Sequence, residues 1–173
     1  MEIATDSASS WAAGSTSLYR SNKAASQVKR LSPAAGALEW AGVGIDAEEA
    51  HRIDQALTAL AEVEDVKSLR FWGRVQGRGA DYFIIEGEPS NHPSTPDSPE
   101  LETGALGANK NTYWVSSIVG GPENWTKLGP VTTAQLKIAP LLRRYFTGDL
   151  TAAVGGHPSF PGSEADYLHA VVV

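Results

Sequence analysis

The sequence contains no cysteine, so it offers no disulfide framework, no thiolate zinc site and no cysteine nucleophile. This absence favours a reducing compartment. No apolar run reaches the roughly 20 residues of a membrane-spanning helix. An excess of basic residues is also lacking: the net charge is −6, whereas phosphate recognition needs a clustered basic surface. We therefore expect neither a membrane nor a nucleic acid as a partner.

The patterns that are present indicate one globular domain. The chain has 173 residues, enough for a single domain with a core of its own. Asp46 and Glu49 have the spacing of a capping box, in which each side chain accepts from an otherwise unpaired backbone N–H of the other residue. Apolar residues then recur at helical spacing, which predicts a helix over residues 47–62.

A second helix is predicted after Thr132 and Gln135, which also have capping-box spacing. Its apolar stripe extends to Phe146. Pro140 lies inside the stripe, where it removes a backbone hydrogen bond and clashes with the preceding turn, so a kink is expected there. Gly148 is predicted to end the helix.

Alternating apolar and polar residues predict strands at 69–76 and 81–86. The glycine-containing residues 77–80 can turn between them and form a hairpin. Both faces of this hairpin carry aromatic residues, which suggests that both sides are covered. Further strands are predicted at 111–118, 125–128 and 167–173.

These elements predict an α+β fold with a small antiparallel sheet and two main helices. Order is expected to begin near Leu38, so the domain should comprise residues 37–173, with the proline-rich stretch 87–110 as a long surface loop. Residues 1–36 are predicted to be a flexible or partner-docking N-terminal arm, because residues 7–33 contain four cations, no acid and few large apolar side chains. A transit peptide has a similar composition, but the acids at the start of the chain favour the arm.

The four histidines raise the question of catalysis or metal binding. Asp166 and His169 would share one face of a helix, but their segment is predicted to be extended. No second histidine stands at a recognised ligand spacing, and neither a phosphate-binding glycine loop nor a nucleophile elbow is present. We therefore expect no catalytic residue, no metal and no cofactor. A small hydrolase-like enzyme using Asp166 and His169 is the less favoured alternative.

Five tryptophans are present, and core packing accounts for most of them. The remainder are candidate interface residues, since Trp is enriched among interfacial hot spots. Two adjacent arginines of the second predicted helix could bind an acidic partner or form a solvated basic face near the helix C-terminus. The candidate partner-contact residues are Trp40, Phe71, Trp72, Trp114, Arg143, Arg144 and Phe146.

Five further patterns stand in register along the chain. They are LEWAGVG at 38–44, RFWGRV at 70–75 with DYFIIE at 81–86, NKNTYWV at 109–115, YFTGDL at 145–150 and PSFPGSEADYL at 158–168. Each pattern alone is weak. In this order and spacing, over about residues 37–171, they resemble the radial spoke head proteins of the four/six type.

The resemblance implies a structural role without catalysis or cofactor. Members of that family build the head of the radial spoke of cilia and flagella, which abuts the projections of the central microtubule pair and relays mechanical signals to the dynein arms. They pair with a similar family member and lie among other radial spoke proteins in the axoneme. A general cytosolic interaction adaptor outside cilia is the alternative.

The sequence departs from the family pattern in three respects. Family members are usually much longer, Pro140 falls where they continue an uninterrupted helix, and residues 155–157 (Gly-Gly-His) replace a bulkier stretch. Strand edges that the longer relatives cover would then be exposed, and exposed edges pair readily with other chains. We therefore expect another subunit to extend or cap at least one of the predicted strands.

Overall fold

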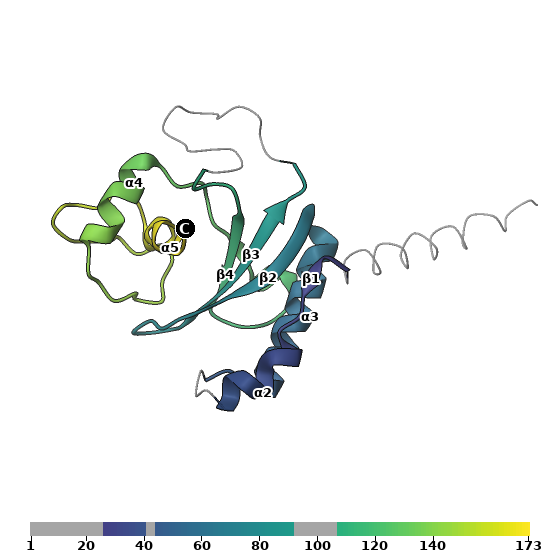
Figure 1. Ribbon diagram of the computed structural model, residues 1–173. Helices are drawn as coiled ribbons and strands as arrows, with labels where there is room; N and C mark the ends of the chain where they lie inside the picture. Colours follow the sequence, from purple (N-terminus) through teal and green to yellow (C-terminus); the bar gives the residue numbers. More distant parts are fainter. Residues whose placement is uncertain (1–25, 41–43, 92–106) are drawn as a thin grey trace, which may run out of the picture.

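A five-stranded sheet lies at the centre of the fold (Figure 1). The computed structural model describes residues 26–40, 44–91 and 107–173. In the order in which they pair, the strands are β1 (Val28–Lys29), β2 (Val66–Val75), β3 (Tyr82–Pro89), β4 (Thr112–Ser116) and β5 (Thr126–Lys127). The helices are α2 (Ser32–Trp40), α3 (Ala47–Val63), α4 (Thr133–Ile138) and α5 (Glu164–Val172), with 3-10 turns η1 (Pro122–Asn124) and η2 (Ala139–Leu141).

The predicted α+β class is confirmed, but the sheet is mixed and not purely antiparallel. Strands β2 to β5 pair antiparallel with their neighbours, including the predicted hairpin of β2 and β3. The exception is β1, which pairs parallel with β2. This strand comes from the segment predicted to be an arm, so the sequence pattern did not include it in the sheet.

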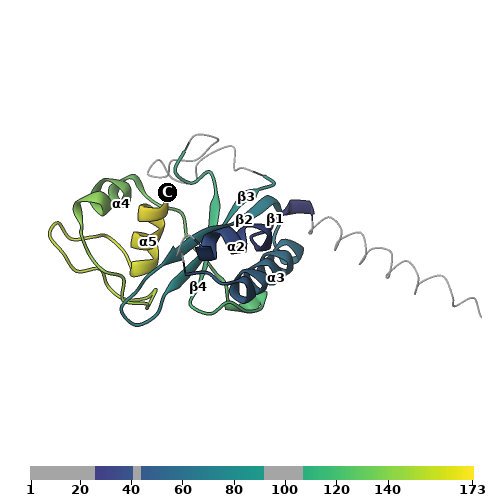
Figure 2. The same cartoon turned by 60° about the horizontal axis from the view of Figure 1, so that its bottom comes forward.

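Helices cover both faces of the sheet, as the aromatic residues on both faces of the hairpin indicated. Strand β3 contributes to each side in turn: Phe83 and Ile85 belong to one apolar cluster, Tyr82 and Ile84 to the other. Helices α2 and α3 lie over the first face, and α4 and α5 over the second (Figures 1 and 2). None of the described helices is long and apolar enough to cross a membrane.

Helix α3 confirms the first predicted helix. Its apolar stripe, which includes Ile53 and Leu57, is fully buried against the sheet. The carboxylate of Asp46 accepts a hydrogen bond from the Glu49 N–H at 2.7 Å and so caps the N-terminus of the helix.

The N-terminal segment packs on the domain from residue 26 onward, ahead of the boundary expected near Leu38. Val28 and Ala35 are buried in the α3-side cluster. Asp54 of α3 is itself buried, and its carboxylate accepts hydrogen bonds from the Leu31 N–H at 2.6 Å and from the Ser32 N–H at 3.0 Å. Asp54 thereby pairs backbone donors at the start of α2. Residues 1–25 of the predicted arm lie outside the described residues.

Replacing Asp54 with Ala is expected to release β1 and α2 from α3. The variant removes the charged acceptor of the Leu31 and Ser32 N–H groups, which are only partly buried, and a hydrogen bond to a charged group contributes about 1.5–3 kcal/mol. Hydrogen exchange measured by mass spectrometry should become faster across β1 and α2, while β3 stays protected. Glu62→Ala, which removes an exposed acid from the same helix, is the control and should leave exchange unchanged. Equal protection in the two variants would contradict this role of Asp54.

The second predicted helix is shorter than its apolar stripe indicated. The capping box of Thr132 and Gln135 is confirmed. The α-helix ends at Ile138, however, and after the 3-10 turn η2 the backbone is extended at Leu142. Pro140 lacks the N–H that would continue the helix, so it ends the helix instead of kinking it. The predicted helical position of Phe146 is therefore wrong: this residue forms a parallel bridge with Gly77.

The predicted terminal strand at 167–173 is also wrong, because this segment forms α5. Ser163 and Asp166 make a capping box at its start. Helix α5 is buried around most of its circumference, so its apolar residues do not form the one-sided stripe that marks a surface helix. The other predicted strands correspond to β4 and β5. Strand β3 extends to Pro89, into the predicted 87–110 loop, and residues 92–106 of that loop lie outside the described residues.

Candidate functional site

Among the described residues, the outer edge of β2 is the longest stretch of strand that no other strand covers. Strand β1 pairs only with Leu69 and Arg70. Beyond Arg70, the edge continues through Val75 without a strand partner among the described residues. Such an edge presents backbone N–H and C=O groups to any extended chain that approaches it.

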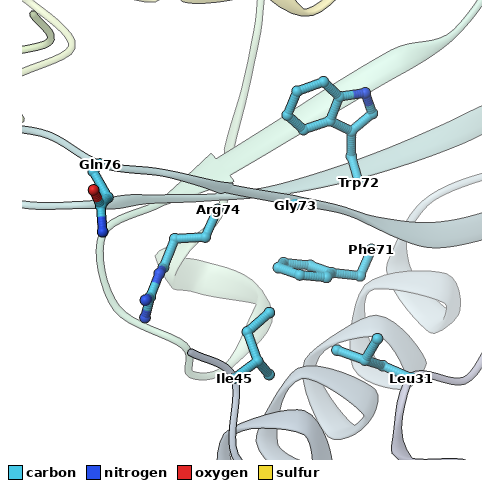
Figure 3. A pocket seen from close by; sticks show the side chains of 7 residues that line it. All are labelled: Leu31, Ile45, Phe71, Trp72, Gly73, Arg74 and Gln76. Atoms are coloured by element: carbon cyan, nitrogen blue, oxygen red, sulfur yellow. The ribbon is translucent and has the colours of Figure 1, made fainter. Parts of the chain in front are cut away.

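A groove of about 490 Å³ lies beside this edge (Figure 3). A β-bulge shapes it: Phe71 pairs with Ile85 and Gly73 with Ile84, so Trp72 is the extra residue. Phe71 and Arg74 consequently lie on the same side of β2, and Trp72 extends from the other side (Figure 3). The groove is lined by Leu31, Ile45, Phe71, Trp72, Gly73, Arg74 and Gln76.

Arg74 supplies the charge of the groove. Its guanidinium is 3.7 Å from a carboxylate oxygen of Glu49 and 3.7 Å from one of Asp81. It also lies 6.0 Å from the centre of the Phe83 ring. The two acids come from α3 and from the start of the returning strand segment, so the arginine is positioned from both sides. The groove therefore combines an apolar wall of Leu31, Ile45 and Phe71 with one oriented cation.

The structure places the predicted contact aromatics in two different environments. Trp40 is 94% exposed at the end of α2, and Trp72 is 38% exposed at the groove. Phe71 is half-buried in the groove wall. Trp114 and Phe146 are buried, one in each core cluster, and are corrected from contact residues to core residues. Helices cover both faces of the sheet, and the sequence pattern alone did not specify which aromatic side chains they bury.

Arg143 and Arg144 are exposed, but they follow η2 in a segment that is neither helix nor strand. This segment belongs with the α4 and α5 layer, whereas the groove lies on the α2 and α3 side of the sheet (Figure 1). The predicted contact residues therefore do not form one surface.

Asp166 and His169, the residues of the alternative enzymatic hypothesis, both have structural partners. Asp166 accepts from the Ser163 N–H at 2.8 Å within the cap of α5. His169 is buried, its Nδ1 lies 2.6 Å from the carbonyl oxygen of Gly129, and burial lowers its pKa. No group of three or more metal-ligating side chains occurs among residues 26–40, 44–91 and 107–173.

The buried carboxylate of Glu164 was not found by sequence reasoning. Its oxygens accept hydrogen bonds from the Tyr82 hydroxyl at 2.7 Å, the Thr147 N–H and hydroxyl at 2.9 Å, and the Gly148 N–H at 3.0 Å. Burial raises the pKa of Glu164, but the hydrogen bonds from Thr147, Tyr82 and Gly148 outweigh burial and hold the pKa below its usual value. Burial and the hydrogen bond to Glu164 raise the pKa of Tyr82. The capping-box spacing of Ser163 and Asp166 was the one local signal for this site.

Comparison with known proteins identifies the family. A sequence model described as radial spokehead-like protein matches residues 5–93 and 88–173. The chain belongs to this family. It is 35% identical over 170 residues to flagellar radial spoke protein 4 of Chlamydomonas reinhardtii, covering 84% of this chain and 36% of the relative. It is 31% identical over 168 residues to human radial spoke head protein 4 homolog A, covering 78% of this chain and 23% of the relative.

A third relative, radial spoke head protein 6 homolog A of Xenopus tropicalis, is 31% identical over 173 residues, with 78% of this chain and 32% of the relative covered. The chain thus matches between about a quarter and a third of the length of these relatives. Three of the patterns that carry the family resemblance, at 81–86, 145–150 and 158–168, meet at Glu164. The resemblance to the radial spoke head family therefore includes residues that hold the fold together.

Proposed function

We propose that this chain is a non-enzymatic structural subunit of the radial spoke, located in the axoneme of cilia and flagella. Its membership of the radial spokehead-like family supports the assignment, and its named relatives are radial spoke and radial spoke head proteins. The chain acts by contact and scaffolds the spoke assembly. Its partners are other radial spoke proteins, including a paralogous spoke head subunit, and the central-pair projections are a further contact.

The uncovered edge of β2 is the observation that carries this proposal. An unpaired edge offers backbone hydrogen bonds to an added strand, and the adjoining groove offers an apolar site for one of its side chains. Phe71 and Trp72 are the aromatic contact residues there, and Arg74 supplies the polar contact. A neighbouring subunit that adds a strand at this edge would cover both the edge and the groove.

Expression of a tagged chain in ciliated cells that lack the endogenous copy tests the proposal. We expect the protein to remain in the axoneme after detergent extraction and to purify with radial spoke proteins. A chain that stays in the cell body and purifies with none of these proteins would contradict the proposal and favour the adaptor alternative.

Replacing Trp72 with Ala is expected to weaken spoke incorporation without unfolding the chain. Truncation of an interfacial hot-spot Trp costs about 2 kcal/mol or more, which lowers the affinity about thirtyfold. The measurement is the ratio of tagged protein in the axonemal fraction to that in the soluble fraction. Val63→Ala, which truncates a side chain that is 69% exposed at the end of α3, is the control and should incorporate normally. Normal incorporation of Trp72→Ala would remove the β2 edge from the interface.

A further inference from the structure

A second exposed surface lies on the opposite layer of the molecule, and it is basic in a chain whose net charge is −6. We call residues 141–145 the basic segment. It runs from Leu141, the last residue of η2, to the residue before Phe146, and the backbone is extended at Leu142. Between Lys127 and Glu164 the chain carries three cations, Lys137, Arg143 and Arg144, against the single acid Asp149. The net charge of this stretch is thus positive, opposite in sign to that of the whole chain.

The cations of this stretch have no acidic partner within the described part of the chain. None of the ion pairs there includes Lys137, Arg143 or Arg144. Asp149 accepts hydrogen bonds from the Thr151 N–H at 2.9 Å and the Thr151 hydroxyl at 2.7 Å, so its carboxylate is engaged locally. The basic segment consequently has positive charge available for a partner.

Large apolar side chains stand on both sides of the two arginines. Leu141 is 65% exposed and Tyr145 is 86% exposed. Isolated exposed apolar residues are ordinary, but here two of them flank a pair of arginines within a stretch of five residues. Tyr and Arg are among the residue types enriched at protein interfaces.

The fold holds the basic segment in place at both ends. Leu142 and Phe146 are buried in the α5-side cluster. The Tyr167 hydroxyl donates to the Leu142 carbonyl at 3.0 Å, and the Phe146 carbonyl accepts from the Arg78 N–H at 2.8 Å. Little conformational entropy therefore remains to be lost in the backbone on binding, which favours affinity.

We propose that the basic segment is a second docking surface, and that it binds an acidic segment of a partner protein whose apolar side chains contact Leu141 and Tyr145. The charge of the arginines selects glutamate-rich and aspartate-rich sequences. A long polyphosphate is disfavoured, because the remainder of this acidic chain repels it and the exposed apolar side chains have nothing to contact along a phosphate backbone. The inference rests on the proposed contact function and adds a partner chemistry to it.

The test measures binding of a fluorescein-labelled synthetic peptide, in which glutamates alternate with leucine and valine, to the purified full-length chain by fluorescence anisotropy. Three comparison probes are the same peptide with lysines in place of glutamates, a single-stranded DNA of equal charge, and vesicles containing phosphatidylserine. We expect the glutamate peptide to bind most tightly and its affinity to fall as salt is raised, because salt screens exposed charges.

Two double variants with equal charge change separate this surface from the general charge of the chain. Arg143→Glu with Arg144→Glu should weaken peptide binding about tenfold or more. Lys29→Glu with Arg52→Glu, which changes two exposed cations on the α2 and α3 side, should change it less than about twofold. If the first double variant does not fold, Arg143→Gln with Arg144→Gln replaces it, with the same expectation.

Three results would overturn the inference: equal binding by both double variants, equal binding of the lysine peptide, or tighter binding of the DNA or the vesicles. The axoneme assay separates this failure from that of the proposed function. A wild-type chain that enters the axoneme but does not bind the glutamate peptide overturns the docking surface alone. A wild-type chain that fails to enter the axoneme overturns the radial spoke assignment.

Discussion

Replacing Glu164 with Ala is expected to lower the free energy of unfolding by about 3 kcal/mol. The variant leaves the buried Tyr82 hydroxyl and the N–H groups of Thr147 and Gly148 without their acceptor. It also removes the carboxylate that hydrogen-bonds strand β3 and the turn after Phe146 to the start of α5. Urea unfolding followed by circular dichroism measures the loss.

Two further variants show whether the carboxylate is the cause. Glu164→Gln keeps an acceptor oxygen but loses the charge, so it should lie between wild type and Glu164→Ala, since hydrogen bonds to charged groups are the stronger ones. Tyr82→Phe removes one donor and should cost about 1 kcal/mol. If Glu164→Ala unfolds at the same urea concentration as wild type, the carboxylate contributes nothing to stability and our description of the site fails.

The same site predicts a pH dependence of stability. The pKa of Glu164 in the folded chain lies below its ordinary value of 4.5, so folding favours the ionised carboxylate. Its contribution is therefore fully present above pH 4.5 and is lost as the pH falls through the lowered pKa of the folded state. Wild type should lose more stability between neutral pH and acid than Glu164→Gln does. Parallel curves for the two proteins would assign the acid sensitivity to other groups.

Replacing Gly148 with Ala is expected to destabilise the fold by about 2 kcal/mol or more. Gly148 has φ of +95°, a conformation that L side chains rarely adopt. A Cβ at this position would lie 2.4 Å from the backbone nitrogen of Ala80. The hairpin turn packs backbone to backbone here, with the Gly79 N–H donating to the Thr147 carbonyl at 2.9 Å, so neither side can move aside independently.

Gly36→Ala is the matched control for this substitution. Gly36 lies in α2, and a Cβ there would meet nothing within 4 Å. Because Ala is the better helix former, this variant should be stabilised by about 0.5–1 kcal/mol. The same chemical change is thus expected to act in opposite directions at the two sites, as measured by thermal unfolding. A destabilisation of equal size at both would contradict the steric explanation.

The sequence predicted best those elements whose determinants are local. Helix α3 has a cap at Asp46 and a one-sided apolar stripe, and its predicted range of 47–62 differs from the observed one by one residue. The β2–β3 hairpin combines alternation with glycines at the turn. In both elements the pattern depends on residues a few positions apart, so a single sequence contains it.

The errors arose where distant parts of the chain decide the structure. Helix α5 is buried around most of its surface by α4 and the sheet, which hid its helical period. Trp114 became a core residue because α3 covers its face of the sheet. Asp54 and Glu164 act on backbone groups 22 and 17 residues away, at Ser32 and Thr147, and no local pattern marks such pairs. Among the contact residues, the exposure of Trp40 and Trp72 likewise depends on which helices cover which edge.

The pairing of β2 with β3 has a mechanical consequence. The two strands pair from Val66 to Val75 of β2 against Pro89 to Tyr82 of β3, interrupted only by bulges. A tension applied along a strand docked on the outer edge of β2 would act parallel to these strands and would shear many backbone hydrogen bonds at once. A pull perpendicular to the strands would instead break these hydrogen bonds one after another, which requires less force. The domain should therefore resist stretching along the β2 axis far better than peeling across the sheet. The direction from which a neighbouring subunit pulls would decide whether the domain transmits the force or unfolds.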